Sequence, residues 1–180
     1  MSTRLRVGVV GLRVGREHVA AFYELREQFQ VTALYDLDPQ KAAQLGGEYA
    51  VAGLAPSFEA MCEMDNVDVI DICTPSFLHF EQTLHAVRSG KHVICEKPIA
   101  LSVQQVEQLI QAERQSSRRI MPIFQYRFGH GIQKLKFLVD QGLVGKAYLA
   151  TIETHWRRRA DYYDNPWRGR RETELGGPDC

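Results

Sequence analysis

Lys97 is the residue of this sequence that is best suited to polar chemistry. It follows a short apolar run at residues 92–95, which predicts a strand buried in a sheet. In open α/β sheets ligands bind beyond the carboxyl ends of the strands, so we expect this lysine close to a ligand. An ammonium there can orient a hydroxyl or carbonyl oxygen, stabilise developing negative charge and help to transfer a proton. Glu96 beside it can anchor the lysine or bond a cofactor. The competing interpretation is a surface lysine in a loop before a helix.

A glycine-rich turn near the N-terminus predicts a phosphate site. The apolar run at residues 5–10 indicates a buried strand, and apolar residues at helical spacing follow from position 19 to position 29. A strand, a glycine turn and a helix together present free backbone N–H groups and a positive helix end to a phosphate. The candidate cofactor-binding residues of this turn are Gly11, Leu12, Arg13, Val14 and Gly15.

This turn departs from the usual dinucleotide fingerprint at Arg13. Gly11 and Gly15 can supply the tight turn and the helix–strand contact, in a turn one residue shorter than the common spacing. Arg13 stands where the middle glycine is expected, so its side chain crowds a pyrophosphate unless the guanidinium folds outward to grip a phosphate. A structural turn that binds nothing is the alternative.

Asp36 predicts which dinucleotide binds. It ends the apolar run at residues 31–35 and lies 21 positions after Gly15. A carboxylate at the tip of the second strand can accept hydrogen bonds from an adenosine ribose and repels a 2′-phosphate, which favours NAD over NADP. The same residues are compatible with a turn and helix cap. NADP also stays open, because the cation of Arg13 could tolerate the additional phosphate.

Composition excludes several classes of protein. The 180 residues contain 22 basic and 22 acidic side chains, so no net charge points to nucleic acid or to an anionic membrane. No apolar run reaches the roughly 18 residues that span a bilayer, and no signal peptide is evident, which predicts a cytoplasmic protein. The four cysteines lack the spacing of metal ligands, so we expect reduced core thiols and no metal site.

The order of elements predicts a doubly wound parallel α/β sheet over residues 1–124. Apolar runs that indicate strands alternate with segments of helical spacing. The expected strands are 5–10, 31–35, 49–52, 67–73, 92–95 and 120–124. The expected helices are 19–29, 39–45 ending at Gly46-Gly47, 57–64, 76–89, and one beginning at Ser102 that buries Val103, Val106, Leu109 and Ile110.

Residues 125–180 differ in character from the first part. After a helix at 132–139, residues 146–156 alternate between apolar and polar, which predicts a half-exposed strand of an open sheet. This indicates the start of an α+β open-sheet domain, and we expect 125–180 to be an incomplete domain for substrate binding and oligomerisation. An open sheet edge invites pairing with a second chain, so a homo-oligomer is expected there.

The sequence resembles the Gfo/Idh/MocA oxidoreductases, the relatives of glucose–fructose oxidoreductase and inositol dehydrogenase. The Glu-Lys-Pro tripeptide and the Thr-Pro-x-x-x-His run before it are the specific parts of the resemblance. It implies a Rossmann domain for NAD(P), followed by an α/β domain on a large open sheet. The implied reaction is hydride transfer between nicotinamide and a carbinol carbon of a sugar, inositol or related polyol. The matching residues are Gly8, Gly11, Gly15, Asp36, Thr74, Pro75, His79, 90–93, Glu96, Lys97, Pro98 and 126–128.

The resemblance also implies roles for individual residues. Lys97 takes the role of the catalytic lysine, and Lys97-Pro98 is expected to be a cis peptide. Cofactor contacts are implied for Thr74, Pro75, His79 and Glu96, beside Lys97 itself. Substrate contacts are implied for Arg127, Trp156, Trp167 and Arg168.

One departure from the family concerns its second acid–base group. The family continues from a glycine stretch into an Asp-x-x-x-His segment whose histidine acts with the lysine, whereas this sequence ends at Cys180 where that segment should begin. His155 is a conceivable substitute, although a lone histidine on a sheet face is more often structural. We therefore expect a truncated family member with very low turnover. The alternative is a non-catalytic module that binds a dinucleotide or another protein.

Overall fold

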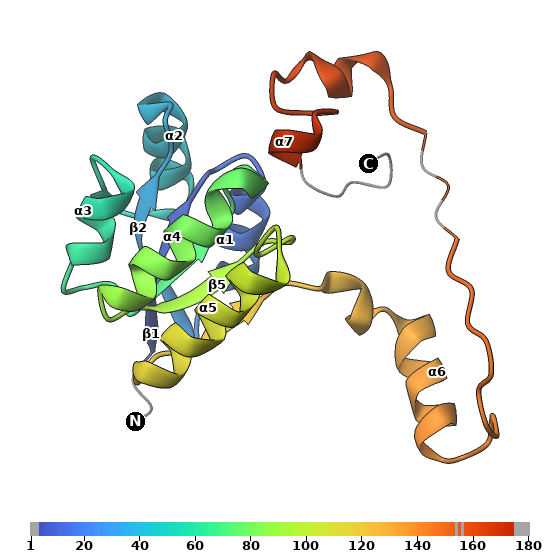
Figure 1. The fold of residues 1–180 in the computed structure, drawn as a ribbon. Helices are drawn as coiled ribbons and strands as arrows, with labels where there is room; N and C mark the ends of the chain where they lie inside the picture. The colour runs from blue at the N-terminus through green and yellow to red at the C-terminus, as the bar shows by residue number, and fades with distance from the viewer. Residues whose placement is uncertain (1–3, 154, 156, 175–180) are drawn as a thin grey trace.

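The computed structural model of the chain describes residues 4–153, 155 and 157–174. Its centre is a six-stranded sheet in the order β3-β2-β1-β4-β5-β6, in which every neighbouring pair is parallel. Helices cover both faces of this sheet (Figure 1). The predicted doubly wound α/β sheet is therefore confirmed. The strands are β1 (Leu5–Val10), β2 (Phe29–Tyr35), β3 (Gly53–Leu54), β4 (Val69–Ile72), β5 (His92–Cys95) and β6 (Ile120–Pro122).

Side-chain caps fix where several helices begin. Asp38 accepts a hydrogen bond from the Gln40 backbone N–H at the start of α2, and Ser57 and Ser102 do the same for α3 and α5. Within the described residues, no helix is long and apolar enough to cross a bilayer. The helices are α1 (Gly15–Glu24), α2 (Pro39–Tyr49), α3 (Phe58–Glu63), α4 (Ser76–Arg88), α5 (Val103–Gln115), α6 (His130–Asp140) and α7 (Arg171–Glu174), with 3-10 turns η1 (Gln125–Phe128) and η2 (Ala160–Asp164).

Two apolar layers hold the helices on the sheet. On one face Val9 of β1 packs with Val19 of α1 and Leu45 of α2. On the other face Val10 of β1 packs with Met61 of α3. Successive strand residues point to opposite faces, so a strand covered on both sides must be apolar throughout, as β1 is. Burial of each such aliphatic side chain contributes about 1.5–3 kcal/mol.

Several predicted helix bounds are wrong. α1 ends at Glu24, and Phe29 begins β2 instead of continuing the helix. α2 continues through Gly46-Gly47 to Tyr49 and is capped by Ala50, whose φ of 56° is left-handed. The short strand predicted at 49–52 is therefore found later in the chain, as β3. Glycine weakens a helix by only about 1 kcal/mol, which packing of Leu45 can offset.

The predicted inward face of α5 is also wrong in part. Leu109 is buried, but Val103, Val106 and Ile110 are 68%, 38% and 42% exposed. Leu109 packs with Phe80 and Leu84 of α4, so only a narrow stripe of α5 is covered.

The described part of the predicted strand at 146–156 is not in a strand. Tyr148, Leu149 and Ile152 are 85%, 86% and 92% exposed. A strand needs a neighbour to pair its backbone groups, and none lies beside this segment in the described chain. Figure 1 shows α6 standing away from the sheet and residues 146–153 running as an extended line, whereas α7 lies beside α4.

An ion pair joins the starts of β1 and β4 and makes stability depend on pH. The Arg6 guanidinium donates to both carboxylate oxygens of Asp68, at 2.9 and 2.7 Å, and its bonds lower the pKa of Asp68 from 3.8 to about 2. The pair therefore stabilises the fold above about pH 4 and loses this effect as pH falls through about 2. We expect Asp68→Asn to lower the urea midpoint modestly at pH 7, with the difference from wild type shrinking between pH 4 and 2. A difference independent of pH would contradict this.

Candidate cofactor-binding site

The register of the parallel strands brings their carboxyl ends to one edge. Val10 lies opposite both Tyr35 and Ile72, and Ile72 lies opposite Cys95, which pairs with Pro122. The ladder extends one step further, because backbone N–H groups just beyond β1, β4, β5 and β6 donate to carbonyls of neighbouring strands. The residues that follow the strands are thus level with one another along this edge: Gly11, Asp36, Cys73, Glu96 and Ile123.

Close approach of the backbone requires glycine at both ends of the turn. Gly11 has φ +84°, and a Cβ there would lie 2.8 Å from the Cys73 carbonyl oxygen. A Cβ on Gly15 would lie 2.9 Å from Cγ1 of Val9, so this glycine lets α1 pack on β1. α1 begins at Gly15 without a side-chain cap, which leaves its positive end available to an anion. The side chains of Arg13 and Val14 are exposed.

Asp36 fixes the shape of this turn. One carboxylate oxygen accepts a hydrogen bond from the Leu12 backbone N–H at 2.7 Å, and the other accepts from the Asp38 N–H at 2.9 Å. The carboxylate is partly exposed at the tip of β2. Each oxygen keeps a second lone pair, so the group can also accept from a ribose hydroxyl.

The loop after β5 carries Lys97 at the same edge. Lys97 is exposed, and its backbone N–H donates to Oε2 of Glu96 at 3.2 Å. The Lys97-Pro98 peptide is cis, which confirms the expectation.

His79 joins this loop to the loop after β4. Its ring is buried, with Nε2 at 2.7 Å from the Thr74 carbonyl oxygen and Nδ1 at 2.8 Å from the Pro98 carbonyl oxygen. Thr74 and Pro75 are half-buried, and Oγ1 of Thr74 donates to Oε1 of Gln82 at 2.6 Å. Because both ring nitrogens of His79 face backbone carbonyls, His79 can influence a bound cofactor only by positioning these two loops.

A buried polar cluster beneath the edge was missed by the sequence reasoning. Nδ1 of His18, in the first turn of α1, lies 2.9 Å from Oδ2 of Asp71 and 3.3 Å from Sγ of Cys73. Nε2 of the same ring lies 3.4 Å from Oε1 of Glu96. The available signal was Asp71, an acidic residue inside an apolar strand, because a buried carboxylate requires a partner.

Charges in this cluster follow from burial and from these contacts. Burial alone would lower the pKa of His18, but contacts with Asp71, Cys73 and Glu96 outweigh it and raise that pKa to about 12. Burial raises the pKa of Asp71, and the bond to His18 opposes this shift. For Glu96 burial is outweighed by the contact with His18, so its pKa is lowered. Burial raises the pKa of the Cys73 thiol to about 12. The His18 imidazolium thus lies between the carboxyl groups of Asp71 and Glu96 and beside the thiol of Cys73.

The residues expected to contact substrate lie in the part of the chain that follows the sheet. Arg127 is exposed on η1. Arg168 is held by its own neighbours: Nη1 donates to Oε1 of Glu174 at 2.7 Å, and the guanidinium lies 3.9 Å from the centre of the Trp167 ring. Trp156 lies outside the described residues. His155 is highly exposed, with Nε2 at 3.5 Å from Glu153.

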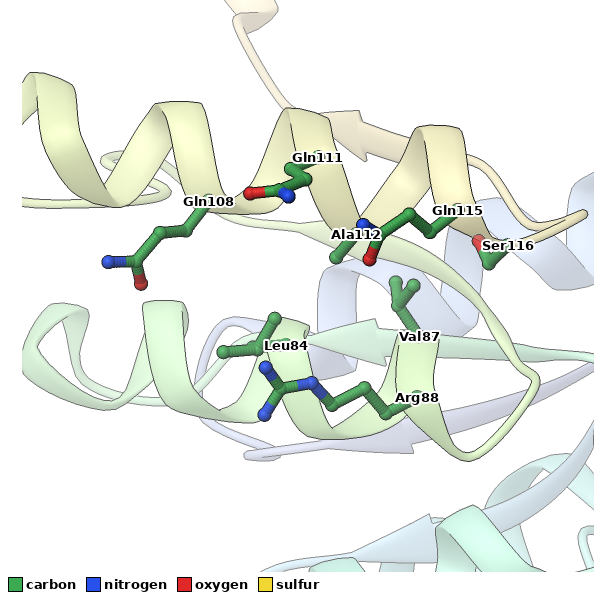
Figure 2. Close-up of a pocket in the computed structure, with 8 residues that line it drawn as sticks. All are labelled: Leu84, Val87, Arg88, Gln108, Gln111, Ala112, Gln115 and Ser116. Carbon is green, nitrogen blue, oxygen red and sulfur yellow. The ribbon is translucent and has the colours of Figure 1, made fainter.

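A groove between α4 and α5 lies apart from the candidate site. Side chains of both helices point into it (Figure 2). On α4 they come from the second half of the helix, whereas α4 begins at the site edge, directly after Pro75. The groove therefore does not join the glycine turn. It is lined by Leu84, Val87, Arg88, Gln108, Gln111, Ala112, Gln115 and Ser116.

Comparison with known proteins identifies related chains. A family model described as "Oxidoreductase family, NAD-binding Rossmann fold" matches residues 5–124. D-glucoside 3-dehydrogenase of Escherichia coli is 30% identical over 151 residues, which are 83% of this chain and 43% of that protein. Inositol 2-dehydrogenase of Pseudomonas fluorescens is 31% identical over 148 residues, 81% of this chain and 44% of that protein. The chain thus spans less than half the length of these curated relatives.

A solved structure matches nearly the whole chain. The WlbA dehydrogenase from Bordetella pertussis, in complex with NADH and UDP-GlcNAcA, superposes with a TM-score of 0.89 at 26% identity. The match covers 97% of this chain and 51% of that one.

Proposed function

The chain belongs to the Gfo/Idh/MocA oxidoreductase family with its NAD-binding Rossmann fold, and from this premise we propose that it carries out hydride transfer between NAD and a carbinol carbon of a sugar, inositol or related polyol. The observation that supports this most is the edge at which the glycine turn, Asp36 and Lys97 meet. The relatives named above are dehydrogenases of a glucoside and of inositol, which supports the class of substrate.

The residues at the edge fit a dinucleotide. A Cβ at Gly11 would collide with backbone, and the uncapped start of α1 provides N–H groups and a positive end for a pyrophosphate. Asp36 would accept from the adenosine ribose, and its charge favours NAD over NADP. Thr74, Pro75, Glu96 and Lys97 would line the nicotinamide end, and His79 would hold their loops together.

Lys97 is the residue to which we assign the acid–base role. Bound NAD would supply the carbon that takes up the hydride. The Lys97 side chain would orient the substrate hydroxyl and, as the neutral amine, would accept its proton while the hydride leaves the carbinol carbon. As the ammonium it would stabilise negative charge on the oxygen and return the proton in the reverse direction. We further propose that residues from about 125 onward, including Arg127, Trp167 and Arg168, contribute to substrate binding and to contacts between copies of the chain. The buried free thiols of Cys62, Cys73 and Cys95 support a reducing, cytoplasmic setting.

Replacing Lys97 by methionine tests the assignment. The variant should bind NADH within about twofold of wild type, because the glycine turn and Asp36 are unchanged. Any NAD reduction measured at 340 nm with a panel of sugars and inositols should fall by about 100-fold or more, the usual contribution of a positioned acid–base group. Lys136→Met, on exposed α6, is the matched control and should match wild type. Equal turnover by the Lys97 variant would exclude its role, and wild type that fails to bind NADH would exclude the proposed function.

A second candidate function is a dinucleotide-binding module that acts by contacting another protein. Ile132, Leu135, Phe137 and Val139 of α6 are 49%, 50%, 59% and 54% exposed, which favours a partner for that helix. Saturable NADH binding without turnover on any substrate of the panel would support this second candidate.

A further inference from the structure

The imidazole of His18 connects three elements that meet below the site edge. It belongs to the first turn of α1, the helix whose start forms part of the glycine turn. Its Nδ1 contacts Asp71 on β4 at 2.9 Å, and its Nε2 faces Glu96 beyond β5 at 3.4 Å. One ring therefore links the expected pyrophosphate end of the site to the loop of the candidate lysine.

Glu96 passes this contact on to Lys97. One of its oxygens faces His18, and the other accepts from the Lys97 backbone N–H at 3.2 Å. The carboxylate is 16% exposed, so its two contacts are only weakly screened by water. Loss of the cation at His18 would leave the carboxylate free to turn toward solvent and release the Lys97 backbone.

His18 also supplies the positive charge that compensates the acidic groups around it. The titratable groups that face the ring are Asp71, Cys73 and Glu96, and Lys97 faces Glu96 in turn. Asp71 has no exposed surface, and its Oδ1 has no hydrogen-bond partner among the described residues. A carboxylate buried in this way is costly without a cation, so His18 is the group that permits Asp71 in the strand.

We propose that His18 is a positioning residue, which acts through Glu96 to hold the Lys97 loop at the nicotinamide end of the bound cofactor. This inference rests on the proposed function. α1 itself is held by other contacts, including those of Gly15 and Val19. The adenosine half of the site therefore does not depend on the ring, whereas the nicotinamide half does.

Affinities for NADH and for ADP separate positioning from general stability. ADP carries the adenosine half of the cofactor and lacks the nicotinamide. We expect His18→Gln in the full chain to weaken NADH binding about tenfold, measured by fluorescence titration, and to change ADP binding by less than about twofold, measured by calorimetry. Glu96→Gln should give the same pattern. The double variant should bind NADH no more weakly than the weaker single variant, because both act on one contact.

Four results would overturn the inference. In the first, the affinities for NADH and ADP fall together, which indicates a structural role. In the second, neither affinity falls. In the third, the losses of NADH affinity caused by the two substitutions add in the double variant. The same three ligand atoms of His18, Asp71 and Cys73 lie within 4.8 Å of one another, so one equivalent of tightly held zinc in purified protein would also overturn it. If His18→Gln fails to fold, His18→Asn takes its place with the same expected pattern. Glu96→Gln alone does not decide, because Glu96 itself lines the nicotinamide end. His85→Gln, on the exposed side of α4, is the matched control and should bind both ligands as wild type does. Failure of wild type to bind NADH would instead contradict the proposed function.

Discussion

Replacement of Gly11 by alanine should lower the free energy of unfolding by about 3 kcal/mol and abolish detectable NADH binding. A left-handed φ of +84° costs an L-residue about 1–2 kcal/mol, and the new Cβ would lie 2.8 Å from the Cys73 carbonyl oxygen and 2.9 Å from the Thr74 nitrogen. Both neighbours are backbone atoms at the site edge, so the turn must move away from β4. Urea unfolding followed by circular dichroism measures the first effect, and NADH titration measures the second.

Gly47→Ala provides the control for this substitution. Gly47 lies inside α2, its added Cβ would meet no atom within 4 Å, and alanine is the better helix former. We expect this variant to be more stable by about 0.5–1 kcal/mol and to bind NADH unchanged. Wild-type stability of Gly11→Ala would contradict the left-handed φ of Gly11 and its close approach to the Cys73 carbonyl.

Asp36→Asn should weaken NADH binding about tenfold and reduce the preference for NADH over NADPH. The substitution removes the charge that repels a 2′-phosphate, and an amide group can accept on one side only. It therefore cannot keep both bonds, from the Leu12 and the Asp38 N–H, that shape the turn. A tenfold loss corresponds to about 1.4 kcal/mol, within the range for a hydrogen bond to a charged group. Titration with both reduced dinucleotides measures the two changes.

Asp38→Asn is the matched control for this effect. It removes the same charge two positions further on, where asparagine caps α2 as well as aspartate does. Both affinities should stay as in wild type. A second substitution, Arg13→Gly, should then lower NADPH affinity in the Asp36→Asn background, because the exposed guanidinium is the cation available to a 2′-phosphate. If the ratio of NADH to NADPH affinity is unchanged in Asp36→Asn, the carboxylate does not contact the adenosine ribose.

The sheet was predictable because its strands carry a strong local signal. Short runs rich in valine and isoleucine, such as β1 and β4, predict strands that are covered on both faces. Once these runs are parallel neighbours, their ends must share an edge, so the placement of Asp36 and Lys97 at the same edge as the glycine turn also followed from the sequence.

The remaining errors arise where local pattern and tertiary context disagree. Phe29 has the spacing of α1 but pairs in register with Leu5 as the first residue of β2. The alternation of residues around Tyr148 is typical of a strand, yet a strand cannot form without a neighbour to pair with. The His18 cluster joins residues 53 and 25 positions apart along the chain, counted from His18 to Asp71 and from Asp71 to Glu96, and no short motif describes such a triangle.

The ring of His79 has a mechanical consequence for the whole edge. Its Nε2 and Nδ1 lie within hydrogen-bond distance of the Thr74 and Pro98 carbonyl oxygens, so the buried ring fills the space between these two segments and donates to one of the carbonyls in either tautomer. A ligand that displaces one of these segments therefore displaces the other as well, so the loops after β4 and β5 move together as one rigid unit.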